Sequence, residues 1–298
     1  MRAFLAALMV TCLAAAAAAG AAERPLVAVV FAQRFYRRAP RGEGWGAKTI
    51  VANVTAALDA AGVEHATITD AEAESDGLLP YAAAIFPYNT VWPEELVEAV
   101  ERYVRGGGKV VLFYAVPERL HALVGTADVG WTKGEFVALR LRPSLVRGLP
   151  RAVRQDSWNI TRVRPAAADA VVAGAWVGPG GEATGEAGLV VSPRGAFMGH
   201  VLTRGDVRAK GRMLLAVLGR LVPEVWRRAS YRAIVSARRV GPLGSLSALR
   251  ERTEDGRLWR SQRRRGRRSL AEALERFQRA TDLSRAGRHA EAIDAAGA

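Results

Sequence analysis

The sequence predicts an α/β fold built on a mostly parallel sheet, with helices on both faces and a basic helical tail behind it. Short apolar runs rich in β-branched residues recur through the first half of the chain, and amphipathic segments with helix-capping signals separate them. Alternation of this kind is typical of strands joined by crossover helices. Because such crossovers are right-handed, successive helices are expected to cover both faces of the sheet.

The first strand is expected at residues 26–33 (LVAVVFAQ), a β-branched run that follows a proline. A polar loop over 34–46 comes next. Residues 47–61 then place their apolar side chains on one helical face, and Gly62 is the stop signal. A weaker strand is expected at 65–69.

A third strand is expected at 81–88, and the next helix begins at Pro93 with the segment PEELVEAVERYVRGGG. This helix has acids in its first turn, arginines in its last turn and glycines beyond its end, in agreement with dipole and capping preferences. Residues 109–116 (KVVLFYAV) form the strongest strand signal in the chain. A short helix over 117–123 follows it.

The second part of the domain has a different pattern. Residues 126–205 contain short strand-like pieces separated by Gly and Pro turns, and we expect them to form an antiparallel extension or the far edge of the sheet. A helix is expected at 206–221, and the α/β domain is predicted to span 23–226. The strand-like pieces are 136–142, 170–176, 188–191 and 196–202.

The segment YAAAIFPYNTVWPEELVEAVERYVRGGGKVVLFYAV resembles the class I glutamine-amidotransferase-like superfamily. It is most similar to non-catalytic members such as the β-galactosidase trimerisation domain. In active members, the turn after the last strand of this segment carries the nucleophilic cysteine. Here that turn is Tyr114-Ala115-Val116-Pro117 and holds no cysteine. The resemblance therefore implies a flavodoxin-like fold without the thiol chemistry.

A wider resemblance runs from about Phe31 to the end of the chain. Blocks such as GWGAKTIVANVTAALDAAGV, SPRGAFMGHVL and LVPEVW look like the N-terminal region of large secreted bacterial proteins with a glycoside-hydrolase-family-10-like barrel further on. No barrel sequence is present here. The resemblance implies an accessory domain for carbohydrate binding, positioning or assembly. Self-association and the origin of the missing barrel, by truncation or frameshift, stay open.

Residues 1–22 have the pattern of a cleaved secretory signal peptide, with a basic start, an apolar stretch and small residues at its end. Export to the periplasm or the cell exterior is expected. Cys12, the only cysteine, lies inside this segment, so the mature chain would have neither a disulfide nor a thiolate nucleophile.

Ligands of open parallel sheets bind beyond the carboxyl ends of the strands, and several polar and aromatic residues follow the expected strands. Aromatic and amide side chains there would stack on and hydrogen-bond a sugar. The alternative is that they are loop residues without a ligand. The candidate ligand-binding residues are Gln33, Arg34, Tyr88, Asn89, Tyr114 and Glu118.

Catalytic patterns are sparse, and we assign no catalytic residue beyond the candidate Glu118. A glycosidase needs two carboxyl groups around one bond, and no spacing among the acids singles out a pair. No Gly-x-Ser-x-Gly elbow is present. The four histidines are dispersed, so we predict neither a metal site nor a cofactor. A hydrolase that uses Glu118 at the cysteine-free turn remains the alternative.

Most of the formal charge of +14 belongs to the tail, since residues 227–298 contain 18 Arg and 8 acids, a net of +10. We divide the tail into a basic linker, 227–268, and a helical segment, 269–298, of two helices joined at Gly287. Because export is expected, an anionic polysaccharide or lipid surface is a better partner than nucleic acid. A solvated, disordered linker is the alternative. The candidate anion-binding residues are Arg260, Arg263, Arg264, Arg265, Arg267 and Arg268.

Overall fold

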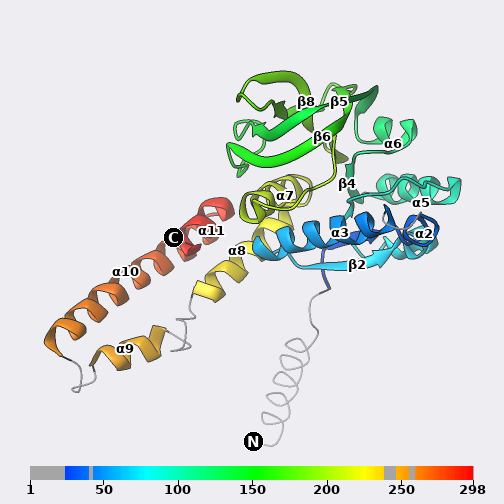
Figure 1. Cartoon of the computed structure of the whole chain (residues 1–298). Coiled ribbons are helices and arrows are strands. Elements are labelled where there is room, and N and C mark those ends of the chain that lie inside the picture. The colour runs from blue at the N-terminus through cyan, green and yellow to red at the C-terminus, as the bar shows by residue number, and fades with distance from the viewer. Residues whose placement is uncertain (1–23, 40–42, 238–245, 255–258, 298) are drawn as a thin grey trace, which may run out of the picture.

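The computed structural model describes residues 24–39, 43–237, 246–254 and 259–297, and the expected signal peptide, residues 1–22, lies outside them. A nine-stranded mixed sheet in the order β2-β1-β3-β4-β9-β8-β7-β5-β6 forms its centre (Figure 1). The strands are β1 (Val27–Phe31), β2 (His65–Thr69), β3 (Ala83–Phe86), β4 (Lys109–Phe113), β5 (Thr126–Leu141), β6 (Ala152–Pro165), β7 (Val171–Val177), β8 (Ala183–Val191) and β9 (Gly195–Met198). The helices of the α/β part are α2 (Gln33–Arg38), α3 (Glu43–Ala60), α4 (Asp70–Glu72), the π-helical turn η1 (Ala73–Gly77), α5 (Glu94–Arg105), α6 (Glu118–Leu123) and α7 (Val207–Leu221). The tail helices are α8 (Pro223–Ala237), α9 (Leu246–Glu254), α10 (Arg260–Arg285) and α11 (His289–Gly297).

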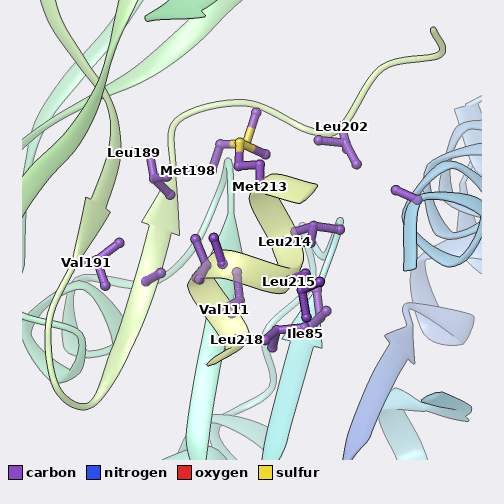
Figure 2. Packing of buried hydrophobic residues seen from close by; sticks show 14 of the residues in the cluster. Ile85, Val111, Leu189, Val191, Met198, Leu202, Met213, Leu214, Leu215 and Leu218 are labelled. Carbon is purple, nitrogen blue, oxygen red and sulfur yellow. The ribbon is translucent and has the colours of Figure 1, made fainter. Parts of the chain in front are cut away.

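The first five strands in the sheet order are β2, β1, β3, β4 and β9. They pair in parallel and are covered on both faces. Alternate residues of β1 enter different cores: Val29 joins the cluster with α3 and α7, and Val30 joins the one with α5. Figure 2 shows α7 packed on the sheet, with Met213 and Leu218 near the strand residues that it labels. The expected cover of helices on both faces is confirmed.

The other strands make the sheet mixed rather than mostly parallel. Among the described residues, β5–β6, β5–β7, β7–β8 and β8–β9 are all antiparallel pairings, equal in number to the parallel ones. The prediction of a mostly parallel sheet is therefore not confirmed, whereas the antiparallel extension over 126–205 is present. The physical reason for three of these pairings is the length of the connections: β5–β6, β7–β8 and β8–β9 are joined by ten, five and three residues, whereas parallel neighbours need a crossover of a dozen residues or more.

The edge strand β6 bends back toward the segment that follows β9. The amide of Thr161 donates to the carbonyl of Gly199 at 2.8 Å, and the amide of Arg154 donates to Asp206 Oδ2 at 2.8 Å. The buried Gln155 side chain donates to the carbonyl of Val201 at 2.9 Å. The antiparallel part of the sheet therefore curls over its own core and brings β6 beside the carboxyl end of β9.

The tail returns to the α/β part through its last helices. Helix α11 packs against α8, and the guanidinium of Arg212 donates to the carbonyls of Gly148 at 2.9 Å and Ala290 at 3.2 Å. Gly287, with φ of 70°, lies between α10 and α11 at the predicted joint. Helix α10 begins at Arg260 rather than Ser269, so the arginine run within it is helical and not a disordered linker. The divisions at residues 226 and 268 stay predictions.

Candidate ligand-binding site at the carboxyl ends of the strands

Four parallel strands, β1, β3, β4 and β9, end at one edge of the sheet, where ligands of open α/β sheets bind. The segments that leave this edge are helix α2, the loop that begins at Pro87, the turn at Tyr114 and the segment that begins at Gly199. The predicted candidates Gln33, Tyr88 and Tyr114 all lie on these segments. The strand-end rule therefore placed these three residues at one edge of the sheet, and their role in binding a ligand stays a prediction.

Five rings form a continuous chain along this edge, which we call the aromatic row. Phe35 of α2 meets Tyr88 edge-on at a centroid distance of 5.3 Å. Tyr88 is stacked on Tyr114 at 6.4 Å with an interplanar angle of 25°. Tyr114 meets His200 at 5.6 Å, and His200 meets Trp158 of β6 at 4.8 Å, both edge-on. Offset and edge-on pairs at these distances are the favourable geometries of aromatic rings.

Tyr114 occupies a strained turn directly after β4. Its φ of 60° lies in the left-handed region, which costs a non-glycine residue about 1–2 kcal/mol. Its amide donates to the carbonyl of Met198 at 2.9 Å, which ties the turn to the end of β9. The turn expected after this strand is therefore present, and Tyr114 is its first residue.

Asn89 is a buried amide with an unmet donor. Its side chain is 2% exposed, its Oδ1 accepts from the amide of Val91 at 3.4 Å, and its Nδ2 has no hydrogen-bond partner among the described residues. The indole of Trp92 donates to the carbonyls of Asn89 at 2.8 Å and Ala115 at 3.0 Å, which joins this loop to the Tyr114 turn. A buried donor without a partner is unusual in folded proteins and is a group that a ligand hydroxyl or water would satisfy.

Gln33 and Arg34 are the first residues of α2, a helix that begins right after β1 where the sequence suggested a loop. The guanidinium of Arg34 pairs with Glu74, and this hydrogen bond lowers the pKa of Glu74. The amide of Arg34 donates to the buried Asp70 at 3.2 Å. Arg34 therefore fastens α2 to the segment after β2, whereas Gln33 is partly buried at the same edge.

Glu118 is the first residue of α6 and is exposed to solvent. It belongs to none of the ring contacts of the aromatic row. Burial lowers the pKa of the neighbouring His121, and the negative charges of Asp128 and Glu118 partly offset this by raising it. Glu118 therefore acts electrostatically on His121, and among the described contacts none connects it with the aromatic row.

His200, on the segment after β9, is a buried and packed histidine. The side chain is 1% exposed, and its Nδ1 lies 3.0 Å from the carbonyl of Val201. Burial and, to a smaller extent, the charge of Lys210 lower its pKa, the hydrogen bond with the Val201 carbonyl opposes them, and the resulting pKa is about 4. The imidazole is therefore neutral near pH 7 and contributes a flat ring rather than a charge.

Sequence reasoning did not place Phe35, His200 and Trp158 at the site. His200 follows β9 as Tyr114 follows β4, so the strand-end rule would have found it once β9 was recognised as a parallel strand. Trp158 carries no such signal, since it reaches His200 only because β6 bends back over the core.

Two further features of the described residues bear on this site. Nowhere in those ranges do three or more His, Cys, Asp or Glu side chains gather in a way that would hold a metal ion. Within the same ranges, every helix is too short or too polar to cross a membrane.

The chain matches no model of a protein family, and no curated protein matches its sequence. Among solved structures, it is similar to a β-galactosidase from Rahnella sp. R3, with a TM-score of 0.51 and 18% identity over 66% of this chain and 31% of that one. It is also similar to α-L-fucosidase isoenzyme 2 from Paenibacillus thiaminolyticus, with a TM-score of 0.50 and 17% identity over 67% of this chain and 33% of that one. The likeness is one of fold. The chain spans about a third of the length of each of these two enzymes.

A ThuA-like protein from Bacteroides uniformis is a further match, with a TM-score of 0.48 and 15% identity over 67% of this chain and 93% of that one. The α/β fold is therefore shared with a part of two carbohydrate-cleaving enzymes, which agrees with the coarse fold that the resemblance implied. At these identities the likeness is one of fold and does not extend to function.

Proposed function

We propose that this protein is a non-catalytic accessory domain that binds a saccharide on its aromatic row. The observation that carries the proposal is the row itself: five rings from α2, two strand-end segments, the segment after β9 and the edge strand β6. The rings come from distant parts of the sequence and meet at the edge where ligands of open α/β sheets bind.

The chemistry of the row suits a sugar. Aromatic rings offer apolar planes to the C–H faces of a pyranose, and Tyr and Trp add a polar tip for its hydroxyl groups. Tyr88 and Tyr114 are partly exposed and nearly parallel, and Trp158 is 65% exposed at the end of the row. The buried Nδ2 of Asn89 is a donor suited to a hydroxyl oxygen.

The wider context of the proposal is an exported carbohydrate-active protein. Its supports are the signal-peptide pattern of residues 1–22, the resemblance to the front region of secreted glycoside-hydrolase-family-10-like proteins, and the fold shared with parts of a β-galactosidase and a fucosidase. In that setting the domain positions a polysaccharide chain or assists assembly. Bond cleavage would belong to another domain.

The direct test is calorimetric titration of the full chain with neutral galacto-, xylo- and cello-oligosaccharides. Tyr114→Ala removes the central ring of the row and is expected to weaken binding by about tenfold or more, the effect of about 1.4 kcal/mol. The matched control is Trp131→Ala, since Trp131 is 52% exposed on β5 and makes its described ring contact with Lys133. Heat from none of the sugars, or equal loss in both variants, would reject the proposal.

The hydrolase alternative makes a separate prediction. If Glu118 were a catalytic acid, the purified chain would release reducing sugar from one of these oligosaccharides, and Glu118→Gln would abolish the release. Binding without turnover, unchanged in Glu118→Gln, is the result that the accessory role predicts. The exposed position of Glu118 at the start of α6, outside the ring contacts of the aromatic row, agrees with this second outcome.

A further inference from the structure

The first turns of α10 carry a concentration of positive charge that the fold itself does not need. Residues 259–271 contain six arginines and no acid. At 3.6 residues per turn, arginines three and four apart share a face, so Arg260, Arg264, Arg267 and Arg268 stand within roughly 100° of the helix circumference. All four are exposed, and so is Arg265 beside them. We call these five residues the arginine face.

This arrangement opposes helix formation in the isolated chain. Like charges three or four residues apart destabilise a helix, and positive charge in a first turn opposes the helix dipole. Among the described residues, the carboxylate that meets the arginine face is Glu272, which pairs with Arg268 at 3.1 Å. An external anionic partner would remove this repulsion, and hence the helix gains stability when the face is covered.

The opposite side of α10 is used for packing. Helix α9 lies against it so closely that a Cβ at Gly266 would stand 2.6 Å from Cγ2 of Thr253, a buried side chain of α9. Figure 1 shows α9 and the N-terminal half of α10 extending away from the sheet. The arginine face is therefore directed away from its supporting helix, and a broad surface can approach it.

Trp259 indicates which kind of partner fits. It directly precedes α10 and is 78% exposed, more than any other large apolar side chain in the described residues. Tryptophan beside a group of basic residues is the combination that anchors proteins at the membrane–water interface, where the indole lies among headgroups and the cations meet phosphates. We propose that the arginine face and Trp259 bind the surface of an anionic phospholipid membrane.

The test is co-sedimentation of the full chain with vesicles of neutral phosphatidylcholine and with vesicles that contain about a third of phosphatidylglycerol. The test variant is R260S/R264S/R267S. The control variant is R142S/R151S/R194S, which removes the same charge from exposed positions of the α/β part. Any contribution from residues 1–22 is the same in all three proteins.

The proposal predicts that binding requires phosphatidylglycerol, that it weakens as salt screens the charges, and that the test variant loses on the order of a hundredfold in affinity while the control stays within about threefold. It also predicts a blue-shifted tryptophan emission on vesicles that is lost in Trp259→Phe. Equal vesicle binding by both triple variants would overturn it. Retention on duplex DNA or heparin that the test variant loses, with vesicle binding absent or unchanged, would overturn it too and assign the face to a polyanion. Far-ultraviolet circular dichroism verifies that each variant is folded.

Discussion

The indole of Trp158 meets the imidazole of His200 edge-on, with the two ring centroids 4.8 Å apart. One residue belongs to the edge strand β6 and the other follows β9, which are separated in the sheet by β8, β7 and β5. The hydrogen bond from the amide of Thr161 to the carbonyl of Gly199 holds the two segments together. Trp158, the last ring of the aromatic row, therefore reaches His200 because the antiparallel strands curl back over the core.

Gln155→Ala is expected to weaken the attachment of β6 to the segment that follows β9. The buried Gln155 side chain donates to the Ser157 hydroxyl at 3.2 Å and the Val201 carbonyl at 2.9 Å, and it accepts from the Thr203 amide at 3.3 Å. Leaving buried partners without hydrogen bonds costs about 2–3 kcal/mol of the free energy of unfolding. Urea denaturation measures the loss. Asp156→Ala, at an exposed neighbouring position, should stay within about 0.5 kcal/mol of the parent.

Tyr114→Gly and Tyr114→Ala separate the role of the ring from the strain of the turn. Both variants lose the ring, but at φ of 60° glycine has no steric penalty, whereas alanine keeps it. The glycine variant is therefore expected to be more stable than the alanine variant by about 1 kcal/mol. The same pair at Tyr88, which is not among the described residues with positive φ, should show the reverse order. Equal stabilities at position 114 would contradict the strain.

The parts of this site that sequence predicted are those fixed by local pattern. Tyr88, Asn89 and Tyr114 follow strands whose apolar runs are unmistakable, so the strand-end rule places them at one edge without knowledge of the strand order. Arg34 follows a strand too, but its guanidinium pairs with Glu74, a partner 40 residues away that no local pattern indicates. The sequence of a single strand also says little about the direction of its neighbours, and for this reason the pattern indicated an antiparallel extension over 126–205 but not that antiparallel pairings would equal the parallel ones in number.

The stability of the α/β part is expected to fall as the pH is lowered from about 6.5 to about 4. The pKa of His200 is about 4 in the folded chain because of burial, whereas an unfolded histidine titrates near 6.5. In this window the unfolded state binds the extra proton, so acid favours unfolding, with a limit of about 3 kcal/mol. Denaturation at several pH values measures this slope. His200→Gln should remove most of it, and an unchanged slope would show that other groups cause the acid sensitivity.

Arg212→Met is expected to release α11 without unfolding the sheet. The guanidinium joins the Gly148 carbonyl, the Ala290 carbonyl and Asp294 Oδ2, which lies 3.1 Å away, and it stands 5.2 Å from the ring centroid of Trp226. Methionine preserves much of the apolar stem but none of these hydrogen bonds. Hydrogen–deuterium exchange should therefore accelerate in residues 289–297, while β1 and β4 keep their protection.

The matched control for this change is Arg220→Met on the same helix, α7, where the side chain is exposed. Loss of charge from α7 is equal in the two variants, so only the contacts with the tail differ. Faster exchange of α11 in Arg212→Met alone would establish that these contacts hold the helix in place. Equal exchange in both variants would mean that the tail is held by its apolar contacts, chiefly those of the partly buried Ile293 with the core under α8.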